Sequence, residues 1–261
     1  MKLKVVSYNI MAGRSQADKT VRDFSNAAAV ISEIEPDIVG LQEVGKHPTA
    51  GFPEYDLAGG PEEFISEKTG LKYNYFAKAI EFSNQPYGNA IISKYPIKSA
   101  KTVMIPDAER TEEGYYETRC VLVAEIDVAG GITVLVSHFG LMSGEHKNAV
   151  KTVSELIKNI KTPVVFMGDL NMTADNPDMK PIFDIIPDTA KGETKPLTWP
   201  SDMNENAAEG DKSYKSMLGN SSARKIDYIF ASEHFKTKSI STFHSLASDH
   251  FPYIAELEID C

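Results

Sequence analysis

The sequence has little cysteine, an excess of acidic over basic residues and no long apolar run. Its two cysteines, Cys120 and Cys261, are too few for a disulfide-stabilised scaffold. No stretch of about 18 apolar residues occurs, so we expect no transmembrane helix. The first residues lack the apolar block of a secretory signal, which predicts a cytoplasmic protein without a membrane partner. A hydrophobic content of 42% excludes an intrinsically disordered chain.

The net charge limits the class of partner. With 27 basic and 37 acidic residues, the chain carries 27 − 37 = −10 formal charges at pH 7. A protein that grips a long duplex by neutralising phosphates needs the opposite balance. A local basic patch or a metal ion can still act inside an acidic protein. Nucleic acid therefore remains a candidate partner, but a long duplex is not favoured.

Hydrophobic patterns predict an α/β fold in a single domain over residues 1–261, because no linker or change in composition divides the chain. A polar loop is expected over 187–224. Helices are predicted over 20–35, 61–69, 144–160 and 177–186, and strands over 3–10, 38–41, 72–80, 88–93, 97–105, 115–127, 132–138, 164–167, 226–231, 237–243 and 252–258.

A strand–helix–strand pattern occurs twice along the chain. In each copy the first strand ends near a polar residue, Asn9 or His138, and the second ends in a carboxylate, Glu43 or Asp169. The separations are similar, since 43 − 9 = 34 and 169 − 138 = 31. Such units are common, so coincidence is one explanation. A true repeat predicts two packed sheets with helices outside and strand ends that converge on one polar cleft.

Other polar residues also stand at the ends of predicted strands. Taken singly, Asn9 and Asp169 are best explained as turn formers, and Ser248-Asp249-His250 as a structural or exposed segment. Asp227 is different, because it lies within an apolar strand and needs a partner near the core. The complete set is more informative than its members: Asn9, Glu43, His138, Asp169, Asn171, Asp227, Asp249 and His250.

The chemistry of this set favours metal-assisted phosphoryl transfer. Asn9, Glu43 and Asp249 offer hard oxygen ligands, which suit Mg²⁺ or Mn²⁺. Such an ion polarises a phosphoryl oxygen and neutralises a leaving oxyanion. Asp169 could hold and deprotonate the attacking water, and His250, oriented by Asp227, could stabilise phosphoryl charge.

The ordered motifs resemble the endonuclease/exonuclease/phosphatase superfamily of DNase I-like metal-dependent phosphoesterases. They run over nearly the whole chain: Tyr8-Asn9, Leu41-Gln42-Glu43-Val44, Gly88 to Ile97, Ser137-His138-Phe139, Gly168-Asp169-Leu170-Asn171, Ile226 to Phe230 and Ser248-Asp249-His250. Two motifs differ from the sequences that are commonest in this family: Ser137-His138-Phe139 replaces Thr-His-Leu, and Leu170 replaces phenylalanine. Both keep the chemically active residues.

The resemblance implies a four-layered α/β/β/α sandwich, with two packed mixed sheets flanked by helices and the site at one edge. It implies metal ligation by Glu43, with Asn9 and Asp249 close by. It implies that Asp169 activates water with the help of Asn171, that His138 and His250 contact the phosphate, and that Asp227 orients His250. Asn89 and Arg119 are added as candidate substrate contacts, although an exposed salt bridge is the favoured interpretation for Arg119.

The substrate is less determined than the chemistry. The favoured function is a divalent-metal-dependent phosphoesterase, more specifically a phosphodiesterase, which is a hydrolase acting on a small or single-stranded phosphoester. One alternative is a DNA or RNA endo- or exonuclease. Another is a binding protein that keeps the fold without activity, which the intact set Glu43, Asp169, Asn171 and His250 argues against. The aromatic residues Tyr115, Tyr116 and Trp199 could stack on a base or sugar, or simply pack.

Overall fold

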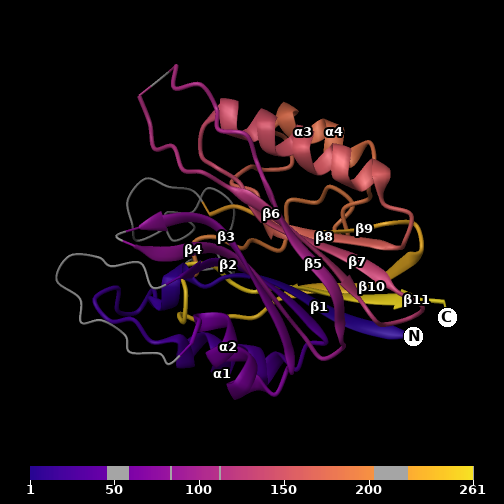
Figure 1. Cartoon of the computed structure of the whole chain (residues 1–261), viewed down its shortest axis with the longest axis horizontal. Helices are drawn as coiled ribbons and strands as arrows, with labels where there is room; N and C mark the ends of the chain where they lie inside the picture. The colour runs from indigo at the N-terminus through magenta and orange to yellow at the C-terminus, as the bar shows by residue number, and fades with distance from the viewer. Residues whose placement is uncertain (46–58, 83, 112, 203–222, 261) are drawn as a thin grey trace.

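The computed structural model describes residues 1–45, 59–82, 84–111, 113–202 and 223–260. Two mixed sheets pack face to face (Figure 1). The first has the strand order β10-β11-β1-β2-β4-β3, and the second has the order β5-β6-β7-β8-β9. Their strands are β1 Lys2–Asn9, β2 Ile38–Gly45, β3 Tyr73–Phe82, β4 Gln85–Ser93, β5 Ile97–Met104, β6 Cys120–Ile126, β7 Ile132–His138, β8 Val164–Asp169, β9 Asp227–Ala231, β10 Phe235–Thr242 and β11 Tyr253–Ile259.

Helices cover the outer face of each sheet (Figure 1). Helices α1 (Phe24–Ile34) and α2 (Pro61–Thr69) lie on the first sheet, and α3 (Ser143–Asn159) and α4 (Lys180–Phe183) lie on the second. Short 3₁₀ turns, η1 (Met11–Gly13) and η2 (Pro177–Met179), complete the described elements. The expected four-layered α/β/β/α sandwich is confirmed. Within the described ranges, no helix has the length and apolar character needed to cross a bilayer.

The sheets approach each other closely beneath the strand ends. Gly40 of β2 shows how tight the contact is, because a Cβ placed there would lie 2.7 Å from the sulfur of Met167 and 2.9 Å from a methyl group of Val136. Only glycine leaves room for β7 and β8 at this point. Val5, Ile38, Val136 and Met167 are fully buried in the core between the sheets. This packing fixes the position of one sheet's strand ends relative to the other's.

Several predicted boundaries were wrong for identifiable reasons. The first helix begins at Phe24 rather than near residue 20, because the side chain of Asp23 caps it by accepting from the backbone N–H of Ser25 at 2.9 Å. The strand predicted over 115–127 begins only at Cys120. The helix predicted over 177–186 divides into η2 and the four-residue α4.

The predicted loop over 187–224 contains ordered contacts in its described parts. Isolated β-bridges join Asp188 to Phe230 of β9 and Trp199 to Arg224, so this segment packs against β9 and against the residues that precede β9. Residues 203–222 lie outside the described residues.

A buried ion pair holds the segment that leads into β9. The ammonium group of Lys225 lies 3.2 Å from the Asp188 carboxylate, and both side chains are 1% exposed. The same ammonium lies 3.6 Å from the ring centroid of Tyr228. Burial lowers the pKa of Lys225 to about 8, against the opposing effect of Asp188. The charge is therefore costly to bury, and its partner carboxylate is needed to keep it stable.

We predict that Asp188→Asn lowers the free energy of unfolding by about 3–5 kcal/mol, because it leaves the Lys225 ammonium buried without a counter-charge. Urea denaturation at pH 7 measures the change. Asp184→Asn is the matched control, since Asp184 pairs with Lys180 on the surface with side chains 58% and 74% exposed. The control should change stability by no more than about 1 kcal/mol. Equal effects of the two substitutions would contradict the prediction.

Candidate active site

The polar residues singled out in the sequence meet at one edge of the two sheets. Strands β1 and β2 are parallel, and so are β7 and β8, so each pair ends at the same edge. The antiparallel neighbours β9 and β11 begin at that edge. Asp227 opens β9, and Asp249 and His250 come just before β11. The expected convergence of strand ends from both repeats on one polar site is confirmed.

The second sheet places three site residues in a row. His138 is the register partner of Asp169, and Asp169 is the register partner of Asp227, across β7, β8 and β9. Register partners in adjacent strands point to the same face. These three residues are far apart in the sequence but lie on adjacent strands as direct neighbours in the sheet.

In the first sheet a bulge turns Glu43 toward the site. Strand β2 pairs Leu41 with Ala90 and Val44 with Gly88, so Gln42 and Glu43 together oppose the single residue Asn89. Glu43 takes the left-handed backbone conformation, with a φ of 55°. Such a conformation costs energy in a residue other than glycine and commonly marks a functional position. The buried Tyr87 forms a hydrogen bond with Glu43; burial, and then the Glu43 charge, raise the pKa of Tyr87 well above its usual value.

Asp169 lies at the centre of the site and is buried. Its Oδ2 accepts a hydrogen bond from Asn9 Nδ2 at 3.0 Å. The Nε2 atoms of His138 and His250 lie 3.4 and 3.5 Å from the same oxygen. Its Oδ1 accepts from the backbone N–H of Asn171 at 3.0 Å. Burial raises the pKa of the Asp169 carboxyl above its ordinary value, and His250 acts in the opposite direction.

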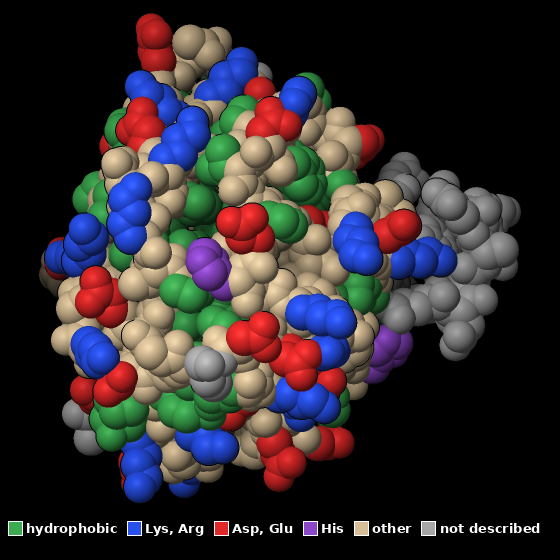
Figure 2. Space-filling view, turned by 90° about the vertical axis from the view of Figure 1, so that its right-hand side faces the viewer, with side chains coloured by type: hydrophobic (Ala, Val, Ile, Leu, Met, Phe, Trp, Pro, Cys, Tyr) green, Lys and Arg blue, Asp and Glu red, His purple; other side chains and the backbone are tan. Residues whose placement is uncertain are grey.

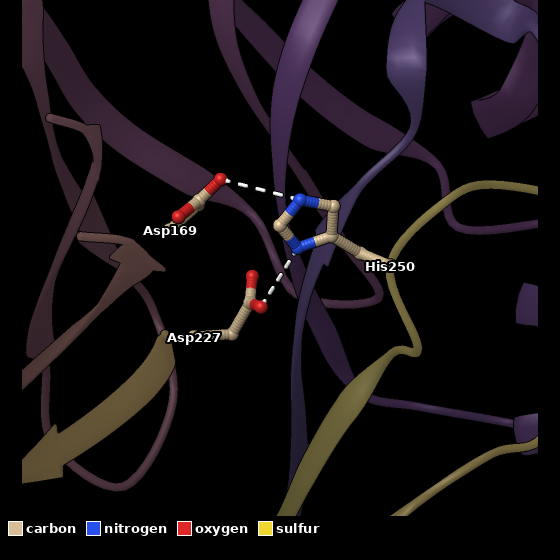
Figure 3. Close-up of side chains that lie close together, drawn as sticks. All are labelled: Asp169, Asp227 and His250. Carbon is tan, nitrogen blue, oxygen red and sulfur yellow. Dashed lines mark hydrogen bonds and ion pairs between the residues drawn. The ribbon is translucent and has the colours of Figure 1, made fainter. Parts of the chain in front are cut away.

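His250 lies between two carboxylates (Figure 3). Its Nδ1 is 2.8 Å from Asp227 Oδ2, and its Nε2 faces Asp169. Burial alone lowers the pKa of His250, but the charges of Asp227 and Asp169 more than reverse this effect and raise it well above its usual value. The predicted partnership of Asp227 with His250 is therefore present in the structure. A histidine held in this way is an imidazolium cation.

The pKa of His138 is shifted in the direction opposite to that of His250. Burial lowers its pKa well below the usual value, and the positive charges of Arg119 and His250 lower it further. Its Nδ1 lies 3.0 Å from a guanidinium nitrogen of Arg119. The amide nitrogen of Asn171 lies 3.1 Å from its Nε2 and donates to the carbonyl of Phe139 at 3.0 Å. Two histidines thus face one carboxylate in different protonation states.

Two groups of side chains at this edge could hold a divalent ion. Asp169, Asp227 and His250 each offer a ligand atom within 4.8 Å of the others. In that group both ring nitrogens already face carboxylates, so an ion would have to displace one of these contacts. The second group consists of the oxygen donors Glu43, Asn9 and Asp249.

The second group suits a hard cation better. Asn9 Nδ2 donates to Glu43 Oε1 and to Asp169 Oδ2, each at 3.0 Å, so two carboxylates converge on one donor. Such converging carboxylates are stabilised by positive charge. Glu43 and Asp249 both line the cleft. The side-chain oxygen of Asn9 accepts from the backbone of Met11 at 3.0 Å, so in this structure Asn9 links the carboxylates through its nitrogen.

A cleft of about 640 Å³ opens above these residues. Its floor includes His138, Asp169, Asn171 and His250. Its walls combine aromatic and apolar side chains with arginines and acids: Ala12, Phe82, Tyr87, Tyr115, Leu141, Trp199, Ile226, Arg14, Arg119, Arg224, Glu43, Glu117 and Asp249. Tyr115 and Trp199 therefore face the cleft. Tyr116 is not among the residues that line it, and the guanidinium of Arg110 lies 5.6 Å from its ring centroid.

Two of the expected substrate contacts differ from the sequence interpretation. Asn89 is buried, donates to the carbonyl of Cys120 at 3.0 Å and does not line the cleft. Arg119 does line the cleft, but its expected exposed salt bridge was wrong. The residue is 9% exposed, and its ion pair with Glu117, at 2.6 Å, is buried.

Sequence reasoning missed several residues that support the site. Tyr87 contacts Glu43, and the Ser248 hydroxyl donates to the carbonyl of Asn9 at 2.7 Å, which ties the start of the last motif to the end of β1. Glu117 holds Arg119. The signal for this last pair was present in the sequence: a Glu-Thr-Arg segment directly before an apolar strand places two opposite charges at a sheet edge.

Comparison with known proteins agrees with this architecture. A protein described as endonuclease/exonuclease/phosphatase from Beutenbergia cavernae has 22% sequence identity, with a TM-score of 0.75 over 99% of this chain and 72% of that chain. D. rerio TDP2 complexed with a single-strand DNA product has 16% identity and a TM-score of 0.66, covering 98% of this chain and 99% of that one. A mannosyl-6-phosphatase from Bacteroides thetaiotaomicron has 14% sequence identity and a TM-score of 0.69, and the match covers 98% of this chain and 100% of that chain.

The sequence itself matches a family model over almost its whole length. The match covers residues 6–250, which includes every strand-end residue from Asn9 to His250. Membership in this group of phosphoesterases supports a hydrolase that acts on phosphoester bonds. The chain belongs to the endonuclease/exonuclease/phosphatase family.

Proposed function

We propose that this protein is a divalent-metal-dependent phosphodiesterase that cleaves its substrate by attack of an activated water. The observation that carries the proposal is the buried chain Asp169–His250–Asp227, in which Asp169 and His250 line a cleft that Glu43 also lines. It combines a carboxylate base, a fixed cation and an oxygen-donor group within one edge of the fold.

Each residue has a role that follows from its contacts. Asp169 accepts the proton of the attacking water, since its carboxylate lies on the cleft floor between two histidines. His250, kept cationic by Asp227, stabilises negative charge that develops on the phosphoryl group. Asn171 takes a left-handed backbone conformation, with a φ of 50°, and through its backbone N–H holds Asp169 in place.

Glu43 and Asp249 would hold the metal, and their carboxylate oxygens favour Mg²⁺ or Mn²⁺. Asn9, expected from the sequence as a third ligand, instead positions Glu43 through its amide nitrogen, because its oxygen accepts from Met11. When bound, such an ion polarises a phosphoryl oxygen and neutralises the leaving oxyanion. The bulge and the bond from Tyr87 orient the Glu43 carboxylate before any ion arrives.

The size and walls of the cleft support a diester over a simple monoester. A volume of about 640 Å³ accommodates a ligand much larger than a phosphate group. Phe82, Leu141 and Trp199 provide apolar surface for ester groups on the phosphate.

The alternative of a nuclease that cuts duplex DNA has less support. The described lining residues include four acids (Glu43, Glu117, Asp169 and Asp249) against three arginines (Arg14, Arg119 and Arg224) and the cationic His250, so they carry no excess of positive charge. The opposite end of the molecule, where the chain termini lie, carries both basic and acidic side chains (Figure 2). A small or single-stranded phosphodiester fits this balance better than a long duplex.

Hydrolysis of two chromogenic reporters tests the proposed function. Bis(4-nitrophenyl) phosphate and 4-nitrophenyl phosphate would be compared with Mg²⁺, with Mn²⁺ and with EDTA. We expect turnover that requires a divalent ion and that favours the diester. A clear preference for the monoester would contradict the diesterase assignment, and full turnover in EDTA would contradict the metal requirement.

We predict that Asp169→Asn abolishes turnover and leaves the thermal midpoint unchanged or higher. The amide keeps the volume but cannot accept the proton, and burial disfavours the carboxylate charge that it replaces. Reporter hydrolysis and thermal denaturation give the two readouts, with Asp184→Asn as an exposed control. Near-normal turnover in Asp169→Asn would remove this residue from the role of base.

Glu43→Gln is expected to raise the metal concentration needed for half-maximal activity by at least about tenfold, because a neutral amide is a weaker ligand for a hard cation. Titration of activity with Mg²⁺ measures the shift, and Glu63→Gln is a control on the exposed side of α2. An unchanged titration would argue that the ion binds elsewhere.

A further inference from the structure

Glu117, Arg119 and His138 line the cleft side by side. Terminal nitrogen Nη1 of Arg119 lies 2.6 Å from Glu117 Oε1 and 3.0 Å from His138 Nδ1. All three side chains are at least nine-tenths buried. The arginine is therefore fixed between a carboxylate and an imidazole ring.

The bond between Arg119 and His138 has only one possible direction. A guanidinium group carries five N–H donors, has no acceptor and stays protonated at any pH at which the protein is folded. Nδ1 of His138 must therefore accept, which requires a lone pair on that nitrogen. A neutral imidazole with a bare Nδ1 carries its hydrogen on Nε2.

The opposite nitrogen faces the reaction centre. Nε2 of His138 lies 3.4 Å from Asp169 Oδ2 on the cleft floor. Nε2 cannot also accept from Asn171, because a neutral ring has a single acceptor nitrogen and Arg119 occupies it. The Asn171 amide nitrogen donates one hydrogen to the Phe139 carbonyl, and in the Nε2–H tautomer its 3.1 Å contact with Nε2 is not a hydrogen bond. The Nε2–H group is thus available to a phosphoryl oxygen that enters the cleft.

We infer that Arg119, anchored by Glu117, is a positioning residue that holds His138 in the Nε2–H tautomer, so that His138 donates a neutral hydrogen bond to the substrate phosphate. The role in catalysis rests on the proposed function, whereas the tautomer does not. The two histidines then have different roles: His250 supplies positive charge, and His138 supplies a neutral hydrogen-bond donor that points at the phosphate. Lysine could not replace Arg119 fully, because its flexible ammonium lacks the fixed planar geometry of the guanidinium.

The test is the ¹⁵N NMR spectrum of histidine-labelled protein, in which protonated and bare ring nitrogens are readily distinguished. The chain has 6 histidines, and His138→Gln identifies the signals of His138. In the wild type we expect a bare Nδ1 and a protonated Nε2. In Arg119→Met we expect this pattern to be lost to the other tautomer or to a mixture. A protonated Nδ1 in the wild type, or an unchanged pattern in the variant, would overturn the inference.

Kinetics with the diester reporter test the positioning role separately. Arg119→Met should lower kcat by on the order of 10- to 100-fold with a smaller change in KM, by analogy with the loss found when a partner that orients a metal-ligating histidine is removed. Arg119→Lys should recover only part of the loss. Arg110→Met is the matched control, since Arg110 is exposed and stacks on Tyr116 outside the cleft. An unchanged kcat in Arg119→Met with the tautomer lost would overturn the positioning role.

Removing Arg119 leaves the Glu117 carboxylate buried without its partner, which is destabilising. The double variant Glu117→Gln/Arg119→Met removes that charge as well and keeps the experiment informative if the single variant does not fold. Its NMR pattern should match that expected for Arg119→Met. If the wild-type tautomer is as inferred but no phosphoester is hydrolysed, the proposed function fails while the assignment of His138 stands.

Discussion

The site depends on one constraint, which is that the Asp169 carboxylate is buried where two sheets meet. A buried carboxylate needs hydrogen-bond donors, and this one receives them from both sheets: the side chain of Asn9 from the first and the backbone N–H of Asn171 from the second. His250, from the segment that enters the first sheet, supplies the positive charge. A displacement between the sheets would break several of these contacts at once. The close packing around Gly40 is therefore part of the chemistry as well as of the fold.

The fold makes this convergence possible through two parallel strand pairs. Each sheet contains one pair joined by a helix, and both pairs end at the same edge of the sandwich. Antiparallel neighbours then enter at that edge and add Asp227 and His250. The result is a row of titratable groups with opposite preferences: a carboxylate that burial makes more basic, a cationic His250 and a neutral His138. Neighbouring groups whose pKa values are shifted in opposite directions can act as base and as charge stabiliser within one cleft.

Much of this arrangement could be predicted from the sequence, because it follows from the ends of apolar strands. Asn9, Glu43, His138 and Asp169 each follow such a run, and the matching separations of the two repeats indicated that they meet. The partnership of Asp227 with a cationic histidine followed from a carboxylate inside an apolar strand.

The remaining features depend on tertiary geometry that local patterns do not contain. The bulge at Glu43 arises from pairing with β4. Arg119 is buried because it comes before β6 and lies against Glu117 and His138 at the cleft. Asn89 looks like a substrate contact in its motif, yet it faces the backbone of Cys120. A motif locates a residue along the chain but does not say on which side of the strand its side chain lies.

The division of labour between Glu43 and the Asp169–His250–Asp227 chain is the central claim, and the position of a bound ion tests it most directly. A crystal of the protein grown with Mn²⁺ would show the ion by its anomalous scattering. The account predicts a peak within about 2.2 Å of a Glu43 carboxylate oxygen, with His250 still between its two carboxylates. A peak bounded by Asp169, Asp227 and His250 would contradict it, because that chain would then be a metal site rather than a base and a fixed cation.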